Sequence, residues 1–139
     1  MLRVSFVTGC FTVKASDGSI SKTVTVTVKN GFVAHGVDAS YANGTVSVDN
    51  WKKVKADGYD FAIIRGGFGR FNLYPSQVDK QFASNYKNAR AAGLDLGVYH
   101  YSYAKTVAEA KTEAYAMVDL LDGKKFEYPI VYDVEEASQ

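Results

Sequence analysis

The residues with the clearest capacity for chemistry are two carboxylates near the end of the chain. Asp133 and Glu135 follow the apolar run 129–132, Pro-Ile-Val-Tyr. Residues two apart on a strand point to the same face, with Cα atoms about 6.5 Å apart. Partial desolvation and a neighbouring negative charge raise the pKa of a carboxyl group, which suits a general acid. The plainer interpretation is that two acidic residues decorate a strand-to-loop junction.

A third carboxylate, Asp38, ends an earlier predicted strand. An aspartate at such a place is often a turn or helix-cap residue. If its strand belongs to the same parallel sheet, Asp38 joins Asp133 and Glu135 in a cluster of three at one edge. No EF-hand-like loop accompanies the cluster, which favours acid–base chemistry over calcium binding.

Aromatic residues are frequent near the same predicted edge. Tyr99, Tyr101 and Tyr103 alternate along one strand, and flat amphipathic rings beside carboxylates suit a sugar polymer. Ordinary packing is the alternative for any one of them. His100 alternates with these tyrosines, so we expect it on the opposite face, buried and without a catalytic role. Arg65 ends another strand and could pair with a strand-end carboxylate or reach a substrate.

The glycine-rich stretch 66–69 invites a phosphate-binding interpretation. It lacks the GxGxxG pattern because position 72 is asparagine. The next predicted helix also begins too late to direct its N-terminus at a phosphate. A nucleotide site is therefore disfavoured.

Composition excludes several classes of protein. The 139 residues carry a net charge of +1 and a single cysteine, Cys10. No basic patch for nucleic acid, disulfide within the chain or multi-cysteine metal site is predicted. The two histidines, His35 and His100, lack metal-ligand spacing, and no apolar run is long enough for a membrane span. We therefore expect no metal, no cofactor, no nucleic-acid partner and no membrane span.

The first part of the chain, residues 1–30, is predicted to be a separate β-hairpin. Residues 23–28 alternate Thr and Val, and residues 11–15 form a second short strand. The Asp-Gly pair at 17–18 supplies a turn.

From residue 34 to residue 139 the pattern alternates strand and helix. Strands are expected at 34–39, 60–65, 96–103 and 129–135. Helices are expected to begin at Ser47 or Asp49, at Ser76 and at Thr106, and to end at Gly58, Gly93 and Gly123. Such alternation predicts an α/β fold with parallel strands, either a small doubly wound sheet or part of a (β/α) barrel. A whole barrel takes about 250 residues, so the barrel interpretation makes this chain a partial one of about four strands and three helices.

Several motifs, in order and at matching spacing, resemble glycoside hydrolase family 25 lysozymes, which are N-acetylmuramidases. The similarity runs from His35 to Gln139 and rests on these segments: Gly36-Val37-Asp38-Ala39-Ser40, Trp51 to Lys55, Phe61 to Arg65, Asp79-x-x-Phe82-x-x-Asn85 with Ala89 and Ala92-Gly93, Gly97 to Tyr101, and Tyr128-Pro129 leading to Asp133-Val134-Glu135. The hairpin at 11–28 resembles the end of a bacterial immunoglobulin-like domain.

The resemblance implies a hydrolase of peptidoglycan glycan strands that cleaves the β-1,4 bond between N-acetylmuramic acid and N-acetylglucosamine. It implies Glu135 as general acid/base, Asp133 as the residue that orients the substrate acetamido group or stabilises positive charge, and Asp38 as a further site carboxylate. Tyr99, Tyr101 and Arg65 are implied as substrate-binding wall residues. The later strands of the family's barrel are absent, so we expect a fragment of the catalytic domain, its N-terminal half.

A secreted or cell-surface location follows from the implied substrate, although no signal peptide is visible. Two alternatives remain at this point: a non-catalytic module that binds cell-wall carbohydrate, and a small doubly wound ligand-binding domain. The Asp133–Glu135 pair together with Asp38 favours the hydrolase over the doubly wound domain.

Overall fold

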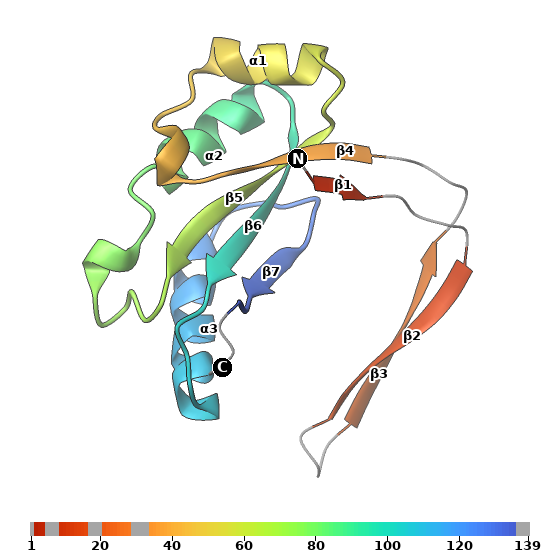
Figure 1. Cartoon of the computed structure of the whole chain (residues 1–139), viewed down its shortest axis with the longest axis vertical. Helices are drawn as coiled ribbons and strands as arrows, with labels where there is room; N and C mark the ends of the chain where they lie inside the picture. The colour runs from red at the N-terminus through yellow and green to blue at the C-terminus, as the bar shows by residue number, and fades with distance from the viewer. Residues whose placement is uncertain (1, 5–8, 17–20, 29–33, 136–139) are drawn as a thin grey trace. The chain divides into compact units, whose positions relative to one another are not determined.

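The structure is a computed structural model that describes residues 2–4, 9–16, 21–28 and 34–135 (Figure 1). The chain divides into two units, one of residues 3–34 and one of residues 35–139 with the first two residues.

The first unit contains an antiparallel hairpin of β2 (Gly9–Ser16) and β3 (Ser21–Val28). Their register runs from Gly9 opposite Val28 to Ser16 opposite Ser21. The predicted hairpin is therefore present, with both strands longer than expected. The predicted turn at residues 17–18 lies outside the described residues. A three-residue strand, β1 (Leu2–Val4), precedes the hairpin in the chain. The immunoglobulin-like origin of residues 1–30 stays a prediction.

The second unit is an α/β sheet in which four parallel strands follow one another in chain order (Figure 1). The strands are β4 (Ala34–Ala39), β5 (Phe61–Phe68), β6 (Asp95–Tyr101) and β7 (Ile130–Asp133). The helices are α1 (Val48–Ala56), α2 (Phe82–Ala91) and α3 (Val107–Leu121), with short 3-10 turns η1 (Tyr41–Asn43) and η2 (Pro75–Gln77). Four parallel strands with three crossover helices confirm the predicted fold class. The described strands form an open sheet, and closure into a barrel stays a prediction.

Side-chain caps fix the beginnings of two helices as the sequence predicts. The Ser47 hydroxyl accepts a hydrogen bond from the Asn50 amide at 3.2 Å, and the Thr106 hydroxyl accepts one from the Glu109 amide at 3.2 Å. Each bond satisfies an amide that has no partner within the first turn of its helix. Of the two candidates for the first helix, the cap is therefore Ser47.

The prediction that the second helix begins at Ser76 is wrong, because α2 begins at Phe82. Residues 75–77 form the separate turn η2, and Val78 is extended and bridges to Gly67 of β5. Asp79, three residues after Ser76, does not complete a capping box. Its carboxylate instead accepts a hydrogen bond from the Gln81 amide at 2.9 Å and turns toward β5.

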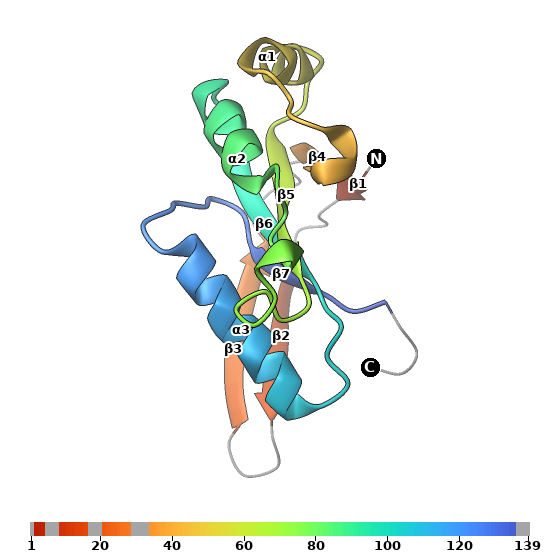
Figure 2. The same ribbon diagram turned by 90° about the vertical axis from the view of Figure 1, so that its left-hand side faces the viewer.

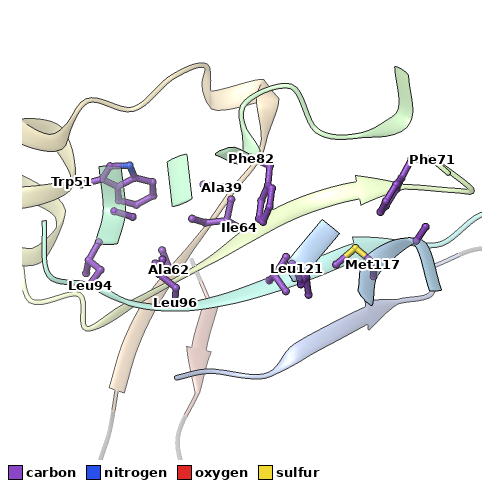
Figure 3. Packing of buried hydrophobic residues seen from close by; sticks show 13 residues of the cluster. Ala39, Trp51, Ala62, Ile64, Phe71, Phe82, Leu94, Leu96, Met117 and Leu121 are labelled. Carbon is purple, nitrogen blue, oxygen red and sulfur yellow. The ribbon is translucent and has the colours of Figure 1, made fainter. Parts of the chain in front are cut away.

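The core lies between the sheet and the helices, as the close view of Figure 3 shows. Alternate residues of β5 and β6 are buried in it: Ala62, Ile64, Leu96 and Val98. They pack against side chains from all three helices, among them Trp51, Phe82, Met117 and Leu121. Figure 2 shows α2 and α3 on the same side of β5 and β6. Because strand side chains alternate between faces, the residues between the core positions point to the other face of the sheet.

Residues 66–68 of the glycine-rich stretch lie inside β5, and Gly69 follows the strand. The pairing with β6 shifts register between Arg65 and Gly67, which marks a bulge. A side chain at Gly67 would collide with the Gln77 carbonyl and the Phe71 ring. Glycine therefore lets the loop after β5 fold back against the strand, where the Asp79 amide bonds to the Gly66 carbonyl at 2.9 Å.

Candidate active site

A groove of about 380 Å³ lies on the face of the sheet opposite the helices. Three carboxylates and one tyrosine provide its polar groups: Asp38, Tyr99, Asp133 and Glu135. Its remaining lining is apolar and consists of Val37, Phe61, Ile63 and Val131. An apolar groove with a few convergent polar groups is the usual form of a ligand site.

Strand register explains why residues far apart in sequence meet in the groove. Asp38 of β4 is opposite Ile63 of β5, and Tyr101 of β6 is opposite Asp133 of β7. All four strands are parallel, so their carboxyl ends lie at one edge, where α/β folds place their sites. The structure thus brings together four of the six predicted site residues.

The fifth predicted residue, Tyr101, lies beside the groove and contacts one of its carboxylates. The Tyr101 hydroxyl donates a hydrogen bond to Oε2 of Glu135 at 3.3 Å. This bond holds the Glu135 side chain, which follows the end of β7, toward β6.

Asp133 is held by its backbone and is partly withdrawn from water. Its carbonyl accepts a hydrogen bond from the Ser102 amide at 2.9 Å. Burial raises the pKa of the Asp133 carboxyl, and the negative charge of Glu135 raises it further. Both effects disfavour the ionised form. Within the pair, the raised pKa therefore belongs to Asp133.

Tyr99 forms part of the groove wall between β5 and β7. Burial raises the pKa of its hydroxyl, while the positive charge of Arg65 acts in the opposite direction. Its hydroxyl also interacts with the side chain of Ser40, the residue that caps η1. Tyr99 therefore stays a neutral hydroxyl that can both donate and accept hydrogen bonds to a sugar.

Arg65, the sixth predicted residue, lies outside the groove. It lines a neighbouring pocket of about 220 Å³ formed where β4 and β5 end. Its Nε donates to Oδ2 of the buried Asp79 at 2.8 Å. The expected pairing with a carboxylate occurs, but the partner belongs to the loop after β5 and not to a strand end.

Two glycines make room for the aromatic end of the groove. The Phe61 ring stacks on Tyr128, with ring centroids 4.0 Å apart and planes 17° apart. A side chain at Gly36 would occupy the space of the Phe61 ring, and one at Gly97 would collide with Ile63 and the Pro129 carbonyl. Both glycines belong to the motifs that carry the family resemblance, and the structure gives a steric reason for the absence of a side chain at each position.

A buried polar cluster lies on the other face of the sheet, beneath the carboxylate pair. Its centre is Glu113 of α3, which is 1% exposed. Its carboxylate accepts hydrogen bonds from the Tyr132 hydroxyl at 2.5 Å, the Ser102 hydroxyl at 2.9 Å and the Tyr103 amide at 3.1 Å. Nε2 of His100 lies 3.2 Å from the same carboxylate. The cluster ties α3 and β6 to Tyr132, the residue before Asp133.

Sequence reasoning foresaw the burial of His100 but missed Glu113. The signal was present, because Glu113 lies four residues before Met117, within the apolar stripe of its helix. A glutamate in such a stripe must find hydrogen-bond donors when it is buried.

The His100 environment makes the stability of the fold depend on pH. Burial lowers the pKa of His100 below its ordinary value of 6.5, against the opposing effect of Glu113. The folded state therefore binds fewer protons than the unfolded state, so the free energy of unfolding falls as the pH drops below about 6.5. Urea denaturation at pH 7.5 and pH 5.5 measures the loss. His100→Gln should lose less stability over this interval, and an equal loss in both proteins would contradict the assignment.

Within the described ranges, His, Cys, Asp and Glu side chains form no group of three that could hold a metal ion. In the same part of the chain, no helix is long and apolar enough to cross a membrane.

Comparison with known proteins identifies the family. Residues 37–139 match the family model "Glycosyl hydrolases family 25". This match covers most of the chain, and the chain therefore belongs to glycosyl hydrolase family 25, as its motifs predicted.

Individual relatives agree with this assignment. Lysozyme M1 of Streptomyces globisporus is 36% identical over 67 residues, which are 48% of this chain and 20% of that protein. The modular autolysin LytC of Streptococcus pneumoniae has a similar structure, with a TM-score of 0.64 and 30% identity over 78% of this chain and 24% of its own. A family 25 glycosyl hydrolase of Bacillus anthracis gives a TM-score of 0.61 at 26% identity, over 74% of this chain and 43% of its own. The chain thus spans between 20% and 43% of the length of these relatives.

Proposed function

We propose that the groove binds peptidoglycan glycan strands and cleaves the β-1,4 bond between N-acetylmuramic acid and N-acetylglucosamine. The observation that carries this proposal is the position of Asp133 and Glu135, which line one groove together with Asp38. Membership of glycosyl hydrolase family 25 supports the reaction class. LytC, the similar autolysin, has also been solved in complex with a synthetic peptidoglycan ligand.

Glu135 is the proposed general acid. Its carboxyl group gives a proton to the glycosidic oxygen as the bond from that oxygen to the anomeric carbon breaks. The Tyr101 hydroxyl, 3.3 Å from Oε2 of Glu135, keeps this group directed along the edge of the sheet. In the second step the Glu135 carboxylate takes a proton from the attacking water.

The position of the pair at the end of β7, with Asp133 as its last residue and Glu135 two residues later, argues against a protein nucleophile. Asp133 and Glu135 approach a bound sugar from the same side, whereas a carboxylate nucleophile attacks the face opposite the leaving group. The substrate has an acetamido group at carbon 2, and its carbonyl oxygen can attack the anomeric carbon from that opposite face. Water then opens the resulting oxazolinium ring, and the product keeps its anomeric configuration.

Asp133 is the proposed partner of the acetamido N–H. Burial in the groove wall makes the ionised carboxylate costly unless it accepts a hydrogen bond. The acetamido nitrogen becomes positively charged as the oxazolinium forms, so its bond to Asp133 strengthens at that stage. Asp38 of β4 and Tyr99 of β6, which line the same groove, contact the remaining hydroxyl groups of the sugar.

The location and domain organisation follow from the same proposal. Peptidoglycan lies outside the cytoplasmic membrane, so we place the protein in the secreted or cell-surface class. Residues 34–139 supply the N-terminal part of a (β/α) barrel, and residues 1–30 supply the last hairpin of an immunoglobulin-like domain.

Asp133→Asn tests the proposed role of Asp133 as partner of the acetamido N–H, separately from the role of Glu135 as general acid. We expect a large loss of rate on glycans that carry a 2-acetamido group. Affinity for these glycans should also fall, whereas affinity for analogues with a 2-hydroxyl group, which lack the proposed nucleophile, should change little. The reason is that only the first kind of glycan presents an N–H to Asp133. Release of reducing ends from the acetamido glycan measures the rate, and titration with the two matched glycans measures the affinities.

Two outcomes would contradict this assignment. Equal losses of affinity for both glycans would show that Asp133 acts on a group other than the acetamido. A product with inverted anomeric configuration, detected by NMR during the reaction, would show that an activated water attacks the anomeric carbon in place of the acetamido group.

A further inference from the structure

The pocket beside the groove contains two cations and two aromatic rings. Its lining includes Arg65, Lys80, Tyr41, Phe68 and Ser76. The Arg65 guanidinium carbon lies 4.7 Å from the centre of the Tyr41 ring and 5.5 Å from that of Phe68. Nζ of Lys80 lies 5.4 Å from the Tyr41 ring centre. The Tyr41 ring thus lies close to both positive charges of the pocket.

The carboxylate in this pocket is already satisfied. Both oxygens of Asp79 accept hydrogen bonds: Oδ2 from the Tyr41 amide at 2.9 Å and from Nε of Arg65 at 2.8 Å, and Oδ1 from the Gln81 amide at 2.9 Å. The Asp79 side chain is fully buried. Two cations therefore face one carboxylate, and the local charge balance is positive.

Arg65 keeps donors that the described residues do not use. Among those residues its guanidinium bonds to Asp79 through Nε, and Nη2 is buried without a hydrogen-bond partner. A buried donor without a partner costs free energy. Nη2 is closed off from solvent and so does not face the pocket. The guanidinium still carries its full positive charge, and the part of it that reaches the pocket attracts an anionic group such as a carboxylate.

The pocket continues the groove along the strands. Arg65 follows Ile63 on the same face of β5 and is opposite Tyr99 of β6, and both Ile63 and Tyr99 line the groove. Tyr41 follows β4, which carries Asp38. Because β4 and β5 are parallel, their carboxyl ends lie at the same edge, and a ligand in the groove can extend along this edge to the pocket.

We propose that this pocket, formed by Arg65, Lys80 and Tyr41, binds the carboxylate on the lactyl branch of a muramyl residue in the glycan. The inference rests on the proposed function, because that function places a muramyl glycan in the adjacent groove. The backbone sugars of such a glycan are neutral, and the lactyl branch or the peptide attached to it carries the negative charge. The pocket thus distinguishes muramyl glycans from neutral polymers of N-acetylglucosamine.

Binding of small probes tests the pocket without relying on hydrolysis. N-Acetylmuramic acid, its methyl ester and N-acetylmuramyl-L-alanine are titrated into the whole ¹⁵N-labelled chain. The amides of Tyr41 and Gln81 report binding in NMR spectra, because both donate to Asp79. We expect the two acids to bind several-fold more tightly than the ester. The tighter of the two acids shows whether the lactyl or the alanyl carboxylate fits the pocket.

Lys80→Gln removes the exposed cation and should weaken binding of the acid about threefold, the size typical of an exposed ion pair. Binding of the ester should not change. Lys111→Gln, an exposed lysine of α3, is the matched control and should leave both unchanged. Arg65→Gln should weaken binding of the acid about tenfold, as expected for loss of a charged hydrogen-bond donor. If that variant does not fold, Lys80→Gln and the ester still decide the question.

Three results would overturn the inference. The protein would bind acid and ester equally, it would bind neither acid, or Lys80→Gln would leave the preference for the acid unchanged. Failure of the proposed function looks different, since a chain that binds the acid selectively but hydrolyses no glycan retains the pocket. Glu135→Gln, which removes the proposed general acid, should keep the full preference for the acid.

Discussion

Glu135→Gln should reduce kcat for cleavage of peptidoglycan by about 10²–10⁴-fold in the protein that carries these residues, as expected for loss of a general acid. The glutamine keeps the size of the side chain and can accept the Tyr101 hydrogen bond, but it has no proton to give the leaving oxygen. KM should change little, because Glu135 acts on the bond that breaks. Release of reducing ends at saturating substrate measures the effect.

The matched control for this variant is Asp119→Asn, which neutralises an exposed carboxylate of α3 away from the groove. It should retain the activity of the unmodified protein. If Glu135→Gln kept most of its rate while Asp133→Asn lost activity on every substrate, the two carboxylates would have exchanged roles. Asp133 would then be the acid, a role that a raised pKa suits.

Glu113→Ala should lower the free energy of unfolding by about 3–5 kcal/mol, because it leaves buried hydrogen-bond donors without an acceptor and each such donor costs about 1–3 kcal/mol. The truncation leaves the Ser102 hydroxyl, the Tyr103 amide and the Tyr132 hydroxyl without their acceptor. Urea denaturation at pH 7.5 measures the loss. At this pH the lowered pKa of His100 keeps its imidazole neutral.

Glu113→Gln provides the comparison, because its amide oxygen can still accept some of these bonds. It should lose clearly less stability than Glu113→Ala. A loss below about 1 kcal/mol for the alanine variant, as for an exposed ion pair, would show that the cluster does not hold β6, β7 and α3 together.

Local patterns were sufficient to predict most of the fold. Short, mostly apolar segments located β5 and β6, and the Thr106 cap located α3, because each signal lies within a few residues of the element it defines. The start of α2 was missed for the opposite reason. Asp79 looked like part of a cap after Ser76, but its carboxylate is used by Arg65 fourteen residues earlier in the chain.

The groove was predictable as far as strand ends define it. The spacing of two residues predicted Asp133 and Glu135 on one face, and both line the groove although β7 ends at Asp133. Parallel strands bring Asp38 to the same edge. The pocket around Arg65 was not predictable, since it depends on a bulge at Gly67 and on a loop that folds back over β5. The catalytic and binding roles of the six predicted residues stay predictions.

The identity of the reducing ends released from purified peptidoglycan tests the central claim most directly. Products of digestion are reduced with borohydride and separated, and their terminal residues are identified by mass spectrometry. The proposed reaction predicts reduced N-acetylmuramic acid at the new ends. Glu135→Gln should release these ends about 10²–10⁴-fold more slowly. New ends of reduced N-acetylglucosamine, or cleavage that Glu135→Gln leaves unchanged, would contradict the account.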